Sequence, residues 1–215
     1  MPDLPDSSAR SEPGRRRVIV LAGPSGAGKS RLAHRLGLPE VRLDDFYKPG
    51  DDPTLPRLAL AGGAPGEHVV DWDSPGSWNL DAALEALESL CREGRTEVPV
   101  YDIATSRVVG RRLLDVGGSA YVVAEGIFAP EVVQACRERG VLAAAVCVTQ
   151  HPALTFWRRL TRDLREHRKP PWVLVRRGLH LARAQRHVVA DARAHGCRVL
   201  TPDQAYADLT ALTRP

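Results

Sequence analysis

The chain has 215 residues, of which 43% are hydrophobic and 26% are charged, and its formal net charge is +4. This length and composition predict a soluble globular protein of one α/β domain that buries its own core. No apolar run approaches the roughly 20 residues of a transmembrane helix, so the composition excludes a membrane-spanning protein.

The N-terminal residues predict a flexible tail. Residues 1–15 are polar and rich in proline, with too few apolar side chains to offset the entropy of ordering them. They lack the apolar stretch of a secretory signal. The four cysteines (Cys91, Cys136, Cys147 and Cys197) match no zinc or CxxC pattern, which favours free thiols in a reducing cytoplasm. Residues 16–215 are then expected to form a single domain in a cytoplasmic protein.

The first half of that domain begins with a short apolar β-branched run at 18–22, which predicts a buried parallel strand. Glycines follow it, and then a helix over 29–36. A second strand is expected at 41–43. Residues 51–76 are rich in Pro, Gly and Asp and predict a long surface segment, a feature that is usually functional.

A clear amphipathic helix follows, capped by Asn79 and stopped by Gly94. The remaining elements are then predicted in this order: a strand at 97–103, a hairpin of 107–109 with 111–116 around Gly110, strands at 121–124 and 143–148, a helix at 152–167, a helix at 173–194, a strand at 197–200, and a short helix from Asp203. Strands that alternate with helices indicate a mostly parallel sheet covered on both faces.

A phosphate-binding motif lies between the first strand and the first helix. It fits the pattern G-x-x-x-x-G-K-[ST] and comprises Gly23, Pro24, Ser25, Gly26, Ala27, Gly28, Lys29 and Ser30. Glycines let backbone N–H groups turn toward phosphate oxygens, and the helix N-terminus favours an anion. Lys29 is expected to reach the β- and γ-phosphates of ATP, and Ser30 to bind Mg²⁺.

Two acidic residues follow predicted strands. Asp44 comes after the second strand, and in an open parallel sheet that position faces the ligand crevice, where a carboxylate can accept the proton of an attacking hydroxyl. An acidic turn or helix cap is the alternative. Glu125 ends the strand 121–124 and is a candidate Mg²⁺ ligand, directly or through water, the alternative being a solvated acid.

The basic residues concentrate between Arg158 and Arg186. Arg158, Arg162 and Arg165 recur at i, i+4 and i+7 of the predicted helix 152–167, so a basic helix that closes over phosphates is one interpretation. A solvated basic face is the other. Because the charge is local, nucleic acid is not expected to be the partner.

Several motifs, in the same order along the chain, resemble the uridine kinase and phosphoribulokinase family of P-loop kinases. After the P-loop they are Asp44-Asp45-Phe46-Tyr47, Asp71-Trp72-Asp73-Ser74-Pro75, Pro99-Val100-Tyr101-Asp102, Glu125-Gly126-Ile127 and the arginine-rich run 158–163. The resemblance implies a P-loop NTPase fold, that is, a three-layer α/β/α architecture with a mostly parallel sheet and a nucleoside-kinase-like lid.

The resemblance also implies roles for individual residues. Asp44 would be the catalytic base, with Lys29 and Arg162 also catalytic, and Arg159 would bind ATP. The acceptor would contact five residues, Asp73, Tyr101, Trp72, Tyr47 and Arg168.

The expected activity is transfer of the γ-phosphoryl group of ATP to the 5′-hydroxyl of a nucleoside, uridine or cytidine, or to a similar small alcohol. The sequence departs from the family where no histidine follows Tyr101-Asp102 and where His167-Arg168-Lys169 replaces an Arg-Gly-Arg in the lid. A guanylate kinase-like enzyme and a non-enzymatic nucleotide- or nucleic-acid-binding regulator are the alternatives. The oligomeric state is left open.

Overall fold

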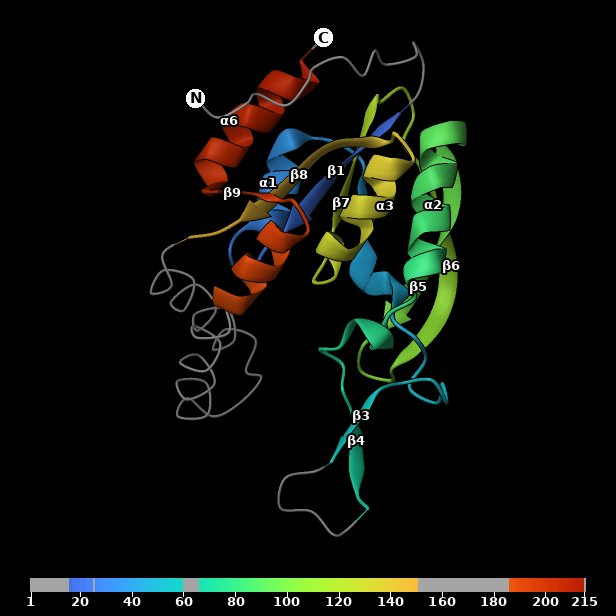
Figure 1. Ribbon diagram of the computed structural model, residues 1–215. Coiled ribbons are helices and arrows are strands. Elements are labelled where there is room, and N and C mark those ends of the chain that lie inside the picture. The colour runs from blue at the N-terminus through green and yellow to red at the C-terminus, as the bar shows by residue number, and fades with distance from the viewer. Residues whose placement is uncertain (1–15, 25, 60–65, 151–185, 215) are drawn as a thin grey trace.

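The computed structural model describes residues 16–24, 26–59, 66–150 and 186–214. The predicted tail at 1–15 and the predicted helix at 152–167 lie outside these residues, as does most of the predicted helix at 173–194. The described residues form an α/β structure around one central sheet (Figure 1).

The central sheet has five strands in the order β2-β7-β1-β8-β9, and every neighbouring pair is parallel. The strands are β1 (Arg17–Ala22), β2 (Glu40–Arg42), β7 (Tyr121–Glu125), β8 (Leu142–Val148) and β9 (Arg198–Leu200). Their apolar residues are largely buried because helices cover both faces. The prediction of a parallel sheet is confirmed.

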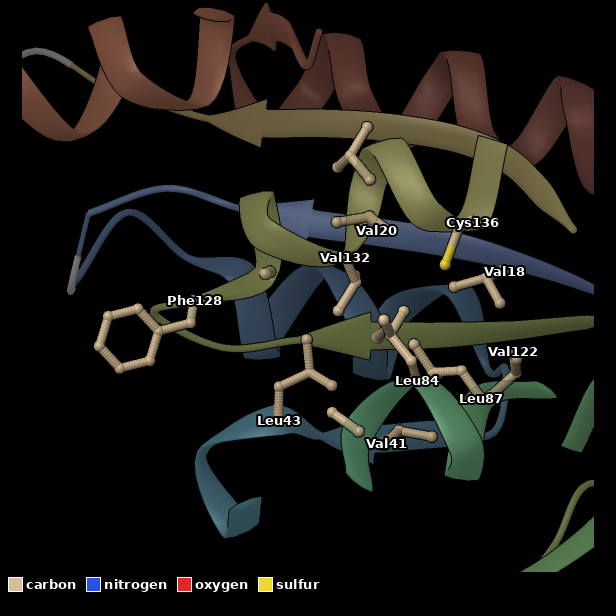
Figure 2. Close-up of a cluster of buried hydrophobic side chains, with 14 of the residues drawn as sticks. Val18, Val20, Val41, Leu43, Leu84, Leu87, Val122, Phe128, Val132 and Cys136 are labelled. Carbon is tan, nitrogen blue, oxygen red and sulfur yellow. The ribbon is translucent and has the colours of Figure 1, made fainter. Parts of the chain in front are cut away.

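Alternate residues of β1 point into two separate cores. Ile19 and Leu21 pack toward α1 (Lys29–Leu36) and α6 (Pro202–Thr213). Val18 and Val20 pack toward α2 (Leu80–Glu93) and α3 (Val133–Glu138), together with the side chains drawn in Figure 2. This alternation gives the three-layer α/β/α arrangement that the motifs implied.

Local signals set the ends of the helices. The Asn79 side chain accepts a hydrogen bond from the backbone N–H of Ala82, and Gly94 ends α2 in the left-handed conformation at φ 80°. Thr201 and Gln204 form a capping box at the start of α6. Residues 186–194 are helical, as predicted. The short helix α3 was not predicted.

The hairpin prediction around Gly110 is wrong. One continuous strand, β6 (Arg107–Asp115), pairs antiparallel with β5 (Arg95–Asp102), and Gly110 lies opposite Val100 within that pairing. The turn lies at 103–106 instead, where the Asp102 carboxylate accepts hydrogen bonds from the Ala104 N–H and the Thr105 hydroxyl. Side-chain chemistry at Asp102 therefore outweighed the glycine signal.

The predicted surface segment 51–76 contains a short antiparallel ladder of β3 (Arg57–Ala59) with β4 (His68–Val70), which projects from the body of the molecule (Figure 1). Within the described residues there are also three 3₁₀ turns: η1 (Leu43–Phe46), η2 (Pro75–Ser77) and η3 (Ala129–Val132). Because η1 begins at Leu43, the strand predicted at 41–43 ends at Arg42. Among the described helices, none combines the length and apolarity that crossing a bilayer requires.

Candidate active site

The carboxyl ends of four parallel strands meet at one edge of the central sheet. The P-loop follows β1, Glu125 ends β7, Asp44 follows β2, and Gln150 follows β8. Parallel strands place their carboxyl ends together, so residues from distant parts of the sequence gather at this edge.

The P-loop backbone needs glycine at its two ends. Gly23 has φ 133°, and a Cβ there would lie 2.2 Å from the carbonyl oxygen of Val148. Gly28 has φ 101° and occupies the N-cap of α1, where no side chain caps the helix and no acidic residue lies in the first turn. The α1 N-terminus therefore presents backbone N–H groups to an anion. Ser25 lies outside the described residues.

Lys29 is held against the P-loop by its own backbone. Its Nζ donates to the carbonyl oxygen of Gly23 at 2.7 Å and approaches that of Pro24 at 3.4 Å. Burial lowers the pKa of Lys29, while the charges of Glu125 and Asp44 act in the opposite direction. A buried cation of this kind gains interaction energy when a phosphate arrives, since the surroundings screen the charges weakly.

Ser30 and Glu125 bring oxygen atoms together beside Lys29. The Ser30 hydroxyl lies 3.4 and 3.5 Å from the two carboxylate oxygens of Glu125. Burial raises the pKa of Glu125, while Lys29 acts in the opposite direction. A hydroxyl and a carboxylate are hard oxygen donors of the kind that Mg²⁺ takes alongside water and phosphate, so these residues fit that ion. Within the described part of the chain, no group of three or more His, Cys, Asp or Glu residues could hold a metal by itself.

The Glu125-Gly126-Ile127 turn holds Asp44 in place. Asp44 Oδ1 accepts a hydrogen bond of 2.9 Å from the backbone N–H of Ile127. The approach is close enough that a Cβ on Gly126 would lie 2.8 Å from Asp44 Oδ1 and 2.8 Å from the Cβ of Leu43. The neighbouring Asp45 is only 6% exposed, whereas Asp44 is partly exposed.

An aromatic cluster adjoins Asp44. The Tyr47 ring lies 5.8 Å from the rings of Trp72 and Tyr101 and 5.7 Å from that of Phe128, measured between centroids. The Tyr47 hydroxyl donates to the carbonyl oxygen of Trp72 at 3.2 Å. Burial raises the pKa of Tyr47, and the charges of Asp44 and Asp73 raise it further. The structure therefore brings four predicted acceptor-site residues, Tyr47, Trp72, Asp73 and Tyr101, to the vicinity of Asp44.

Sequence reasoning missed two members of this cluster. Phe128 is 6% exposed and links Tyr47 to Trp78, with 5.8 Å between the Phe128 and Trp78 rings. The Trp78 indole donates to the carbonyl oxygen of Leu43 at 2.7 Å and so supports the turn that carries Asp44. Trp78 could have been noticed as the apolar residue before the Asn79 cap, but nothing local marks Phe128.

Three predicted site residues, Arg159, Arg162 and Arg168, lie outside the described residues, together with the expected lid. The described part of the site consists of the P-loop, the Ser30–Glu125 pair, Asp44 and the aromatic cluster.

The sequence relatives of the chain include a pyrophosphatase and a uridine kinase, although no protein-family model matches the chain. It is 30% identical over 162 residues to the inorganic pyrophosphatase TTM2 of Arabidopsis thaliana. The aligned region covers 74% of this chain and 21% of that protein. The chain is 24% identical over 201 residues to a uridine kinase of Lactobacillus johnsonii. This second aligned region covers 89% of this chain and 84% of that enzyme. The chain thus spans about a fifth of the length of the first relative and most of the second.

Among solved structures, a candidate fructose transport system kinase from Silicibacter sp. TM1040 superposes with a TM-score of 0.50 at 19% identity, and the match covers 90% of both chains. At that identity the superposition supports the fold, which agrees with the strand order and the P-loop described above. The chain is therefore similar in sequence to a uridine kinase over most of its length, and its fold is that of a P-loop kinase.

Proposed function

We propose that the chain is an ATP-dependent kinase that transfers the γ-phosphoryl group to a hydroxyl of a small acceptor, such as the 5′-hydroxyl of a nucleoside. The observation that supports this most directly is the short link between the two halves of the site. Glu125 lies beside Ser30 of the P-loop, and two residues later the Ile127 N–H binds Asp44. One turn thus connects the phosphate side with the acceptor side.

On the phosphate side, the P-loop N–H groups and the α1 N-terminus bind phosphate oxygens. Lys29 exchanges its contacts with the P-loop carbonyl oxygens for the transferring phosphoryl group. Ser30 and Glu125 would hold Mg²⁺, which would neutralise negative charge on the phosphates of ATP.

On the acceptor side, Asp44 accepts the proton of the attacking hydroxyl. The Ile127 hydrogen bond engages Oδ1 and fixes the position of the carboxylate, which leaves Oδ2 to receive the proton. The partly exposed rings of Tyr47, Trp72 and Tyr101 offer surface for a planar or apolar part of the acceptor, and Asp73 offers a carboxylate for its hydroxyls.

An acceptor screen tests the proposal. The protein is incubated with ATP and Mg²⁺ and, in turn, uridine, cytidine, ribulose 5-phosphate and pantothenate, and phosphorylated acceptor is detected by mass spectrometry. Asp44→Asn is expected to abolish acceptor phosphorylation. Asp81→Asn, at an exposed position in the first turn of α2, is the matched control and retains it. Failure to phosphorylate any alcohol in a broader panel would count against a kinase.

The similarity to TTM2 raises a second activity, because that relative is named as an inorganic pyrophosphatase. Hydrolysis replaces the acceptor hydroxyl with water at the same phosphate site. Phosphate release measured with and without acceptor separates the two activities. A kinase consumes ATP in proportion to acceptor, whereas a pyrophosphatase releases phosphate from pyrophosphate at a rate that acceptor does not change.

A further inference from the structure

The strand β8 delivers a side-chain amide to the P-loop. Its last residue, Val148, packs its carbonyl oxygen against Gly23, at the start of the loop. Two residues later, Gln150 lies beside Gly28, at the end of the loop, since a Cβ on Gly28 would lie 3.9 Å from Gln150 Nε2. The segment from Val148 to Gln150 therefore lies alongside the P-loop, with Val148 near Gly23 and Gln150 near Gly28.

The backbone before Gln150 is anchored. The register of β8 with β9 runs from Val146 to Val148, and the Thr149 N–H donates to the carbonyl oxygen of Leu200 at 2.9 Å. Gln150 is thus one residue beyond a hydrogen-bonded pair of strands, and its side chain is partly buried. An anchored backbone limits where the partly buried amide can lie, and binding of a ligand requires such placement.

The Gln150 amide is a hydrogen-bond donor at a position that favours an anion. Gly28 is the N-cap of an uncapped helix and directly precedes Lys29, so the surroundings favour an anion. A glutamine amide carries two N–H donors and no charge. It can therefore donate to a phosphate oxygen without adding a cation next to Lys29.

We propose that Gln150 is a phosphate-contacting residue of the nucleotide site and donates from Nε2 to the phosphate chain held by the P-loop. The inference rests on the proposed function, because it assumes that the P-loop binds a nucleotide. It assigns a direct contact to a residue that neither the P-loop motif nor the arginine-rich run contains. Hydrogen bonds to charged groups are among the stronger ones, so the loss of this contact is expected to weaken binding by about ten- to a hundred-fold.

The test compares the wild-type protein with Gln150→Ala and Gln150→Glu by titration calorimetry against ATP and against inorganic tripolyphosphate. Tripolyphosphate lacks a base and a ribose, so it isolates the phosphate contact. Gln150→Ala should weaken both ligands by a similar factor, and Gln150→Glu should weaken them further, since it places a negative charge beside the phosphates. Gln134→Ala, at an exposed glutamine of α3, is the matched control and should leave both affinities unchanged.

The outcomes separate the inference from the proposed function. Wild-type protein that binds neither ATP nor tripolyphosphate refutes the P-loop function itself. Wild-type binding together with unchanged affinity in Gln150→Ala overturns only the role of Gln150. A loss of ATP affinity without a loss of tripolyphosphate affinity would place Gln150 on the nucleoside and also overturn the inference. Equal thermal stability of Gln150→Ala and the wild type checks that the effect is not a folding defect.

Discussion

Substitution of Gly126 by alanine gives the most specific perturbation of the site. The added Cβ would lie 2.8 Å from Asp44 Oδ1 and from the Cβ of Leu43, whereas ordinary contacts lie at 3.4–4 Å. The Asp44 oxygen could swing away, but the Leu43 Cβ is one bond from the backbone and belongs to a fully buried side chain. Either η1 or the 125–127 turn must therefore move, and either movement displaces Asp44 relative to Ile127.

The size of the effect follows from this geometry. Relief of the contact requires a shift of about 0.6 Å, enough to stretch the 2.9 Å bond between Ile127 and Asp44 beyond useful hydrogen-bond length. Misplacement of a reacting group by about 1 Å can cost on the order of 10²-fold in rate. We therefore expect kcat to fall roughly ten- to a hundred-fold, while overpacking destabilises the fold by about 1–3 kcal/mol.

The assay measures kcat with the acceptor found in the screen, ATP affinity by calorimetry, and the urea midpoint for unfolding. Affinity for ATP should change less than about two-fold, because the substitution does not touch the P-loop on β1. Gly118→Ala is the matched control, since Gly118 has no atom within 4 Å of an added Cβ and no positive φ. It should preserve all three quantities.

Two results would refute this reasoning. Unchanged kcat in Gly126→Ala would mean that the position of Asp44 does not govern the reaction. Equal losses of kcat and ATP affinity would mean that the turn supports the nucleotide rather than the acceptor.

Four further predictions concern single residues. Lys29→Ala should reduce kcat by at least about 10²-fold because it removes the cation that neutralises the transferring phosphoryl group, and an unchanged kcat would contradict this. Asp44→Asn should lower kcat by about 10²- to 10⁴-fold with little effect on ATP affinity, whereas parallel losses would assign the base elsewhere. Glu125→Gln should raise, by several-fold, the Mg²⁺ concentration for half-maximal activity, and an unaltered Mg²⁺ titration would exclude Glu125 as a ligand. Burial raises the pKa of Cys136 from 9.0 to about 12. The neutral thiol therefore contributes to the free energy of unfolding; this contribution is fully present below pH 9 and is lost as the pH rises toward 12. Urea unfolding should show a loss on the order of 1 kcal/mol at pH 10 from this thiol, and that part of the loss should be absent in Cys136→Ala.

The sequence alone determined the features whose causes are local. The apolar β-branched run before Gly23 and the Gly-Lys-Ser ending of the P-loop predict the strand, the loop and the helix that follow, because strand burial and helix initiation depend on neighbouring residues. The bounds of α2 followed from Asn79 and Gly94 for the same reason. The local signal failed at Gly110, where the side chain of Asp102 formed the turn instead.

Only the tertiary structure decided which residues meet. Asp44 and Ile127 are 83 positions apart, and their hydrogen bond depends on the parallel pairing of β2 with β7, which no local pattern encodes. The need for glycine at 126 and the proximity of Gln150 to Gly28 arise in the same way, from the register between distant strands. Strand register is set by the burial of whole faces against the helices, so contacts across the sheet edge emerge only when the chain is packed.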